Sequence, residues 1–297
     1  MSDRKEERIL VLVNPVSGVR RRKLPGFVAM LEEGLAAKSY KIQLLVTRYA
    51  GHASRSVDEA LRQGVRRFVV AGGDGTVNEV AARLAGTDAV LGIIPAGSGN
   101  GLAHHLEIPM NTAGAIRVIN EGKLLRIDTC TVNGHFFASI AGIGFDARVA
   151  RHFAKSNRRG FFTYARIVVK EYFGYTPRKY KLVLDGREHE ARAFFISFAN
   201  SSQFGYNTRI APRASVTDGL IDVCVAKKPP IRAFPGIARL MLRKKIDQSR
   251  YMETYHAKEI LVSRKRGKTV NVDGEPVRLA KRLQISIQPA SLNIIVP

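Results

Sequence analysis

Three short segments of the sequence combine glycine with residues that could contact a phosphate group. They read NPVSG at residues 14–18, GGDGT at 72–76 and PAGSGNG at 95–101. Glycine lets backbone N–H groups converge on an anion without obstruction by a Cβ atom, and a helix that follows adds a favourable dipole. This chemistry suits a nucleoside triphosphate, although neither the GxxxxGK[ST] loop nor the complete dinucleotide fingerprint is present.

The elements that must position these segments are four short apolar runs and the stretches between them. The runs are ILVLV (9–13), IQLLV (42–46), FVVA (68–71) and VLGII (90–94), and helical spacing occurs at roughly residues 24–38, 53–64 and 76–85. Apolar strands that alternate with helices indicate a parallel sheet covered on both faces. Three of these strands end in the glycine segments, so we expect one site at the carboxyl edge of the sheet.

Some of these residues have a purely structural explanation. Thr76 and Glu79 are spaced as a capping box, which predicts that both residues cap the helix after the third strand. The same glycines could also make simple turns. Three such loops at one sheet edge favour the phosphate site.

Beyond about residue 125 the pattern becomes that of antiparallel strands. Three dipeptides favoured in two-residue hairpins occur there, namely Asn133-Gly134, Asp185-Gly186 and Asp273-Gly274. Two helices are expected, near residues 160–173 and 231–243. The segment GIGFDA (142–147) resembles part of a dinucleotide motif, but we expect no strand-to-helix junction in this β-rich half. The predicted domains are residues 1–125, of α/β type, and residues 126–297, mainly antiparallel β, from which the last strand can return to the first domain.

Composition limits the setting and the partners. The chain has 297 residues and a formal net charge of +23, which predicts attraction to an anionic surface or polymer. The two cysteines, Cys130 and Cys224, are too few for a disulfide framework, so a reducing cytoplasm fits best. We expect neither a membrane-spanning segment nor a secretion signal.

Seven segments in order resemble the diacylglycerol kinase catalytic domain family, the lipid kinases that include bacterial diacylglycerol kinases and the sphingosine and ceramide kinases. They are VNPVSG, TRYAGHA (47–53), GGDGTVNEV, IPAGSGNGLA, AGIGFDA, IAPRASVTDGLIDV (210–223) and VNVDGEP. The form AGSGNGLA is more similar to the sphingosine kinase loop than to the usual bacterial one. The resemblance implies an NAD kinase/diacylglycerol kinase-like α/β domain that binds ATP, a C-terminal β-sandwich that binds lipid, and a cleft between them.

The resemblance also implies roles for individual residues. Glu275 would be the general base that takes the proton of the lipid hydroxyl, with Asp273 beside it and Asp74 as a further catalytic group. The residues expected to bind the nucleotide are Asn14, Ser17, Gly18, Thr47, Gly73, Asp74, Gly75, Thr76, Asn78, Gly97, Ser98 and Asn100.

Magnesium is the second implied cofactor, because phosphoryl transfer depends on neutralising phosphate charge. Asp74 and Asp128 match two of the family's acidic positions, whereas Gly101 stands where bacterial members have the third acid. The resemblance implies another, structural Mg²⁺ held by Asp218 and by the carbonyls of Ser215 and Leu220.

The function predicted in this way is ATP-dependent phosphorylation of the hydroxyl of a diacylglycerol or sphingoid-type lipid. The basic charge would serve peripheral association with an anionic membrane. Two alternatives stay open: a soluble NAD kinase-like enzyme that uses a small-molecule acceptor, and a non-enzymatic binder of an anionic surface. No motif for nucleic-acid recognition is evident, and a homodimer stays open.

Overall fold

The computed structural model describes residues 7–16, 24–36, 40–156, 160–205 and 208–297. The chain divides into two compact units, one formed by Met1–Ile127 with Ala290–Pro297 and the other by Asp128–Pro289. The long strand β18 (Arg282–Val296) leaves the second unit and ends in the first. In the part of the chain that the structure describes, no helix has the length and apolar character needed to cross a bilayer.

The first unit contains a parallel sheet in the strand order β2-β1-β3-β4. Its strands are β1 (Arg8–Val13), β2 (Lys41–Val46), β3 (Arg67–Gly72) and β4 (Val90–Pro95). Each of them contains one of the predicted apolar runs. The end of β18 adds a further parallel pairing to β4, through Asn293 and Ile294.

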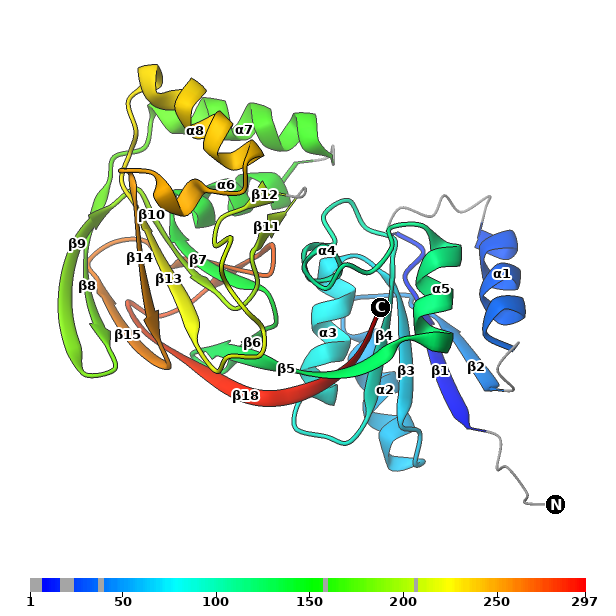
Figure 1. Cartoon of the computed structure of the whole chain (residues 1–297). Helices are drawn as coiled ribbons and strands as arrows, with labels where there is room; N and C mark the ends of the chain where they lie inside the picture. Colours follow the sequence, from blue (N-terminus) through cyan, green and yellow to red (C-terminus); the bar gives the residue numbers. More distant parts are fainter. Residues whose placement is uncertain (1–6, 17–23, 37–39, 157–159, 206–207) are drawn as a thin grey trace. The chain divides into compact units, whose positions relative to one another are not determined.

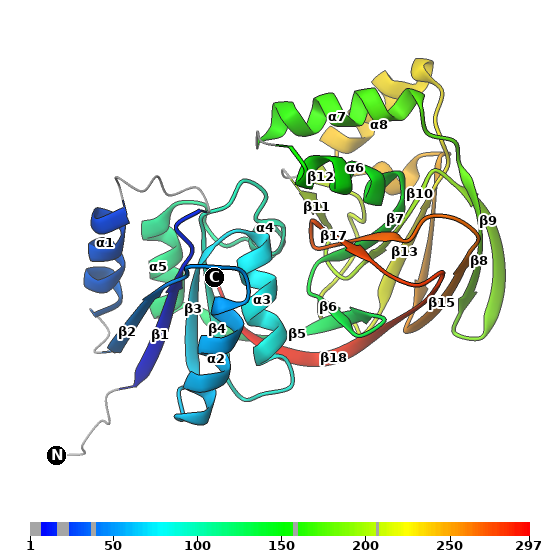
Figure 2. The ribbon, with the colours of Figure 1, turned by 180° about the vertical axis from the view of Figure 1, so that it is seen from behind.

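Helices cover both faces of this sheet, as Figures 1 and 2 show. They are α1 (Leu24–Ala36), α2 (His52–Arg62), α3 (Asp74–Leu84), α4 (Gly101–His105) and α5 (Thr112–Glu121). Gly92 of β4 faces the side chain of Ile119 on α5, whereas Gly72 of β3 faces Thr76 on α3. Val69 pairs with Gly92, so Gly92 and Gly72 point to opposite faces. Helices α4 and α5 were not among the predicted elements.

The second unit is a β-sandwich made of two antiparallel sheets. One has the order β14-β13-β10-β7-β16-β17, and the other contains the run β18-β15-β8-β9. The strands are β5 (Lys123–Val132), which enters from the first unit, β6 (His135–Phe137), β7 (Ile140–Gly144), β8 (Arg178–Leu184), β9 (Arg187–Ala193), β10 (Phe195–Ala199), β11 (Gln203–Gly205), β12 (Thr208–Arg209), β13 (Ile221–Ala226), β14 (Met252–Ala257), β15 (Glu259–Arg264), β16 (Thr269–Val272) and β17 (Glu275–Arg278). Side chains such as Phe198 from one sheet and Ile260 from the other are fully buried in one core. The predicted fold class, an α/β domain with a parallel sheet and an antiparallel β-sandwich, is confirmed.

All three predicted hairpin turns are present. In each dipeptide both residues have positive φ, for example 46° at Asp273 and 91° at Gly274, which is the conformation of a type I′ turn. The turns connect β5 to β6, β8 to β9, and β16 to β17.

Helices occupy one end of the second unit. They are α6 (Phe145–Ala154), α7 (Phe161–Phe173), the 3₁₀ turns η2 (Ile231–Ala233) and η3 (Ile246–Gln248), and α8 (Phe234–Leu242). Helices α7 and α8 were predicted, but α6 was not. The expectation that GIGFDA lacks a strand-to-helix junction was wrong, because β7 ends at Gly144 and α6 begins at Phe145. The strand is nevertheless antiparallel to β10 and β16.

Candidate functional site

Asp74 joins two of the glycine loops of the first unit. It is the first residue of α3, and its carboxylate accepts hydrogen bonds from the backbone N–H of Asn100 at 2.8 Å and of Gly101 at 2.6 Å. Burial raises the pKa of the Asp74 carboxyl above its ordinary value, and these two N–H donors partly offset that effect. The carboxylate therefore fixes the turn after β4 against the start of α3.

Glycine is required here because the loops touch. A Cβ atom on Gly97 would lie 2.5 Å from the Cα of Gly73, and one on Gly99 would lie 2.4 Å from Oδ2 of Asp74. Asn100 closes its own loop, since its side chain accepts from the N–H of Gly97 at 3.0 Å and donates to the Gly97 carbonyl at 2.8 Å. Larger residues would separate the backbone segments that the site brings together.

The first glycine loop is attached to the same cluster through Asn14. Its Nδ2 donates to Oγ1 of Thr76 at 2.7 Å, and its Oδ1 accepts from the N–H of Val16 at 3.0 Å. Thr47 lies one strand away, where its N–H donates to the carbonyl of Val13 at 2.9 Å. The ends of β1, β2, β3 and β4 thus place Asn14, Thr47, Asp74 and Asn100 at the same edge of the sheet.

The remaining predicted nucleotide-binding residues lie on these loops or outside the described residues. Gly75 and Ser98 are exposed, and Gly73 and Asn78 are half-buried. Ser17 and Gly18 lie outside the residues that the structure describes.

The predicted capping box at Thr76 and Glu79 was wrong. Helix α3 begins two residues earlier, at Asp74, with Gly73 as its N-cap and no side-chain cap. Oε1 of Glu79 instead accepts from the backbone N–H of Ser54, in the first turn of α2, at 2.9 Å. Glu79 thus binds an N–H group that lacks an intrahelical partner, as a capping residue does, but this group belongs to the neighbouring helix α2.

In the second unit, Asp273 anchors the hairpin that carries Glu275. Its carboxylate accepts from three consecutive backbone N–H groups, at 2.8 Å from Ala138, 3.0 Å from Ser139 and 2.7 Å from Ile140. Glu275 begins β17 and is exposed. The two acids of the DGE segment therefore differ in their surroundings, since Asp273 is held by the backbone and Glu275 faces solvent.

Asp128 and Asp218 meet at one turn of the second unit. Oδ2 of the buried Asp128 accepts from the N–H of Gly219 at 2.7 Å, while Oδ1 of Asp218 accepts from the N–H of Leu220 at 3.0 Å. Ser215 lies in the same turn, where its hydroxyl is 3.2 Å from that of Thr217. The four residues proposed here as metal ligands, Asp128, Ser215, Asp218 and Leu220, thus belong to one folded segment and the strand beside it.

The sequence analysis missed a buried polar segment next to the backbone that Asp273 binds. Nδ2 of Asn200 donates to the carbonyls of Asp128 and Ala138 at 2.8 and 2.7 Å. Both amide atoms of Gln203 are buried without a partner among the described residues. The run of uncharged polar residues at 200–203, directly after the apolar strand β10, is the sequence signal that could have identified it.

A second missed residue is Asp146, on the first turn of α6. It is fully buried, and both of its oxygens accept from Nδ2 of Asn271, at 3.1 and 3.0 Å. Burial raises the pKa of Asp146 to about 7, and the hydrogen bond from Asn271 acts in the opposite direction. Asn271 lies on β16, two residues before Asp273. Asp146 therefore lies at the base of the hairpin that carries Glu275.

The acidic side chains of the site are the candidate ligands for Mg²⁺. Among the described residues, no group of three or more His, Cys, Asp and Glu side chains could hold a metal ion. The Asp74 carboxylate accepts from the backbone N–H groups of Asn100 and Gly101 and from its own N–H, which leaves one of its roughly four lone pairs. Such a carboxylate fits Mg²⁺, which usually retains several waters and is held by one or two carboxylates together with substrate phosphates.

Known proteins resemble this chain in both of its domains. Residues 8–132 match the model of the diacylglycerol kinase catalytic domain, and residues 139–296 match the YegS C-terminal NAD kinase β-sandwich-like domain. A protein of Pectobacterium atrosepticum named "Probable lipid kinase YegS-like" is 29% identical over 293 residues, which cover 89% of each chain. A diacylglycerol kinase of Bacillus subtilis is 28% identical over 277 residues, with 91% of this chain and 90% of the relative covered.

A solved structure extends the similarity to the whole chain. The crystal structure of a diacylglycerol kinase from Bacillus anthracis str. Sterne matches with a TM-score of 0.81 and 26% identity, covering 99% of this chain and 98% of the other. Both domain models, in this order, and the shared fold lead to one assignment. The chain belongs to the diacylglycerol kinase catalytic domain family of lipid kinases, with a YegS-type β-sandwich as its second domain.

Proposed function

We propose that this protein transfers the γ-phosphoryl group of ATP to the hydroxyl of a diacylglycerol or a sphingoid-type lipid. The observation that carries the proposal is the hydrogen-bonded cluster of Asn14, Thr76, Asp74 and Asn100, which joins three glycine loops at the carboxyl edge of a parallel sheet. That edge is where open α/β sheets bind phosphorylated ligands. Membership of a lipid kinase family supplies the acceptor class.

The residues of the first unit would bind and orient the nucleotide. The glycines at 73 and 75 would leave backbone N–H groups accessible to phosphate oxygens, and α3 directs its positive end toward the same edge. Gly97 would let its loop approach the phosphates closely. The side chains of Asn14, Thr47, Thr76, Asn78, Ser98 and Asn100 would add hydrogen bonds. Ser17 and Gly18 are included from the sequence alone.

Glu275 is proposed as the general base. It would accept the proton of the lipid hydroxyl as the oxygen attacks the γ-phosphorus, and the bond from phosphorus to ADP would break. Asp273 would position it, since its carboxylate holds the hairpin through three backbone N–H groups. A base placed within reach of the reacting proton contributes about 10²- to 10⁴-fold to the rate.

Magnesium is part of the proposal. When bound with ATP, the ion neutralises phosphate charge during transfer. Asp74 would hold it, directly or through water, and Asp128 is the second acid that the resemblance suggests. Asp218, with the carbonyls of Ser215 and Leu220, would hold the structural ion.

The proposed setting is the cytoplasm, with peripheral association to an anionic membrane. Both cysteines are buried and free, which suits a reducing compartment. The net charge of +23 favours an anionic lipid surface.

A screen of acceptors with γ-labelled ATP and Mg²⁺ tests the proposal. The purified protein is incubated with diacylglycerol, sphingosine or ceramide in mixed micelles, and separately with NAD. Label in an extractable lipid is expected. Transfer to NAD alone would establish the small-molecule alternative, and no transfer to any acceptor would favour a non-enzymatic binder.

A further inference from the structure

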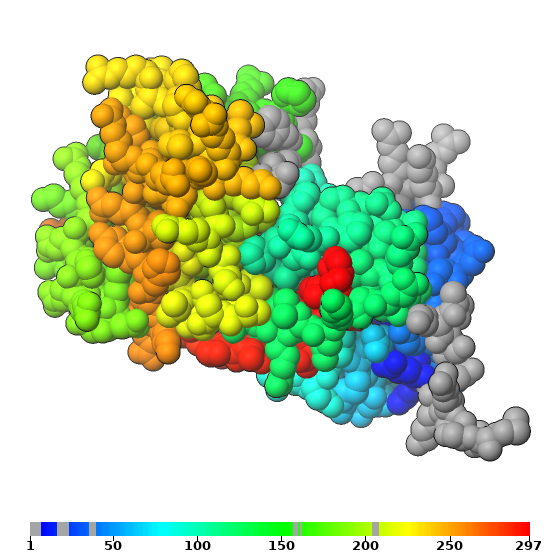
Figure 3. Space-filling view, in the orientation of Figure 1, coloured from blue at the N-terminus to red at the C-terminus, as the bar shows by residue number. Residues whose placement is uncertain are grey.

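Helix α8 is apolar and yet none of its residues is buried. Its sequence FPGIARLML contains one charged residue, and Leu242 is 86% exposed. A short helix of this composition ordinarily packs its apolar side into a core. In the space-filling view, α8 and the residues after it lie at the surface of the second unit (Figure 3).

The neighbouring helix α7 presents the same combination of side chains. Its inner side packs Tyr164, Ile167, Val168 and Tyr172 against the aromatic cluster of Phe145 and Phe194. Its outer side exposes Phe162, Arg166, Val169, Lys170 and Phe173, which follow helical spacing. Phe162 is 88% exposed. The outer side of α7 is therefore apolar and basic rather than simply polar.

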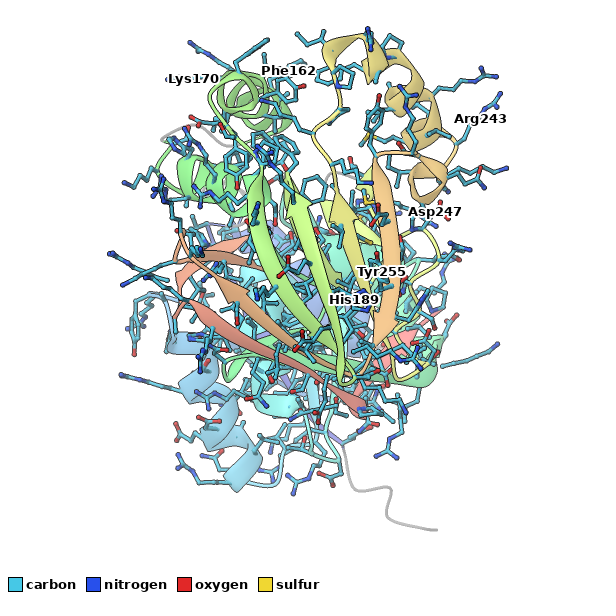
Figure 4. The ribbon with its side chains drawn as sticks, turned by 90° about the vertical axis from the view of Figure 1, so that its left-hand side faces the viewer. Phe162, Lys170, His189, Arg243, Asp247 and Tyr255 are labelled. Atoms are coloured by element: carbon cyan, nitrogen blue, oxygen red, sulfur yellow. The ribbon has the colours of Figure 1, made fainter. Side chains whose placement is uncertain are left out.

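The two helices are adjacent and attached to each other. The rings of Tyr172 on α7 and Phe234 on α8 are 5.1 Å apart, and the hydroxyl of Tyr172 donates to the carbonyl of Pro229. Figure 4 shows Phe162 and Lys170 on α7 and Arg243 after α8 at the same end of the unit. We call the exposed residues of α7 and of residues 231–250 the helical face.

Cations surround the apolar residues of the helical face. Between residues 231 and 250 the basic residues are Arg232, Arg239, Arg243, Lys244, Lys245 and Arg250, and the one acid is Asp247. Asp247 already pairs with Arg213 at 3.0 Å. The acid of α7, Glu171, is buried and pairs with Arg148 and with His152. The exposed charge of the face is therefore positive.

An open groove of about 710 Å³ runs beside α8 within this surface. Arg232, Arg239, Arg243 and Arg250 all line it. Among the described residues, no carboxylate lies within ion-pair distance of these four arginines. Guanidinium groups bind phosphate with two parallel hydrogen bonds, so the groove has the chemistry of a phosphate site.

We propose that the helical face docks onto an anionic phospholipid bilayer, with Phe162 and Leu242 inserted among the acyl chains and the arginine groove holding lipid phosphates. An apolar helix side flanked by Lys and Arg is the pattern of an element that lies in a membrane interface. Each cation near an anionic surface strengthens binding by about fivefold. Two-fold pairing with a second copy would oppose like charges, so the positive charge favours a membrane over a dimer interface.

This inference rests on the proposed function, because a membrane surface is where the lipid acceptor resides. Its test measures binding without catalysis. Wild type is sedimented with phosphatidylcholine vesicles and with vesicles containing about one-third phosphatidylglycerol, at about 0.15 M salt and without ATP. Binding to the anionic vesicles only is expected.

Three variants locate the surface. The triple variant Arg232→Gln/Arg239→Gln/Arg243→Gln should weaken binding to anionic vesicles by at least about thirtyfold. Phe162→Ser/Leu242→Ser should weaken it by about tenfold or more, because both apolar contacts are lost. The control Lys179→Gln/Arg187→Gln/Arg192→Gln removes the same charge from the β8–β9 hairpin and should change binding by less than about threefold. Equal losses in the two charge variants would overturn the proposal.

Other outcomes have equally clear meanings. Sedimentation velocity that shows a dimer dissociated by Phe162→Ser/Leu242→Ser, with vesicle binding unchanged, would assign the face to a second copy and overturn the proposal. Loss of duplex DNA binding in the arginine variant, with vesicle binding unchanged, would assign the surface to nucleic acid and overturn the proposal. The proposed function is tested separately with a short-chain diacylglycerol in detergent micelles. A wild type that binds anionic vesicles but phosphorylates no such lipid would contradict the kinase proposal and leave the docking surface standing.

Discussion

The backbone N–H of Gly101 donates to Oδ1 of Asp74 at 2.6 Å. Gly101 is the position at which bacterial relatives were expected to carry a further acid, and here its backbone contacts the acid that remains. Asp74 therefore lies within one glycine loop and holds the turn after β4 through two backbone N–H groups.

Gly99→Ala is expected to weaken ATP binding by at least about tenfold, which is about 1.4 kcal/mol. The added methyl group would lie 2.4 Å from Oδ2 of Asp74, so either the carboxylate or the loop must shift and the contact between the two loops is disturbed. Titration with a fluorescent ATP analogue measures the dissociation constant. Gly26→Ala on α1 is the matched control, because its methyl group would meet nothing within 4 Å. Equal affinity of both variants would show that the packing of these loops does not shape the nucleotide site.

Asp273→Ala should lower the free energy of unfolding by about 2–4 kcal/mol, because three backbone N–H groups lose a charged acceptor. Denaturant unfolding followed by circular dichroism measures the change. Asp273→Asn keeps one oxygen acceptor and should lose less. A loss of activity in either variant without loss of stability would indicate that Asp273 acts on the substrate directly rather than through the hairpin.

Asp146→Asn should remove one contribution to the pH dependence of stability. The unfolded chain loses the Asp146 proton near its ordinary pKa, whereas burial raises the pKa in the folded state to about 7. Between these values the folded state binds more protons at Asp146, so the contribution of this residue to wild-type stability falls by about 1.4 kcal/mol per pH unit and levels off above pH 7. The variant has no such proton, and its amide can pair with Asn271, whose Oδ1 is buried without a partner among the described residues.

Unfolding curves recorded from about pH 5 to pH 8 provide the comparison. The stability of Asp146→Asn relative to wild type should rise with pH up to about 7 and then stay constant. A constant difference across this range would mean that Asp146 is ionised in the folded protein.

The fold was largely predictable because its signals are local. Apolar runs such as residues 68–71 and dipeptides such as Asp185-Gly186 determine strands and turns through their own chemistry. Helix α6 was missed because the glycines of GIGFDA give no clear sequence signal for the end of β7 and the start of the helix. The partner of Glu79 was also not predictable, because Ser54 is 25 residues away in sequence and only the packing of α2 beside α3 brings them together.

The residues of the candidate site were also predictable to different degrees. Motif residues such as Asn14 and Asp74 could be identified from the sequence, because the ends of neighbouring parallel strands lie at one edge. Asp146 could not, because its importance comes from burial and from hydrogen bonds to Asn271, 125 positions away. The polar run at 200–203 signals a buried segment, but not the carbonyls that Asn200 contacts, which lie more than 60 positions away. Spacing in the sequence contains no record of such contacts.

The initial rate of label transfer from γ-labelled ATP into extractable lipid measures whether Glu275 assists phosphoryl transfer from ATP to a lipid hydroxyl. Wild type should label diacylglycerol or a sphingoid lipid. Glu275→Gln should reduce the rate by at least about a hundredfold with unchanged ATP affinity, while Glu188→Gln, an exposed acid on β9, should retain full activity. Equal rates for wild type and Glu275→Gln would show that Glu275 is not the general base, and label found only in NADP would show that the acceptor is not a lipid.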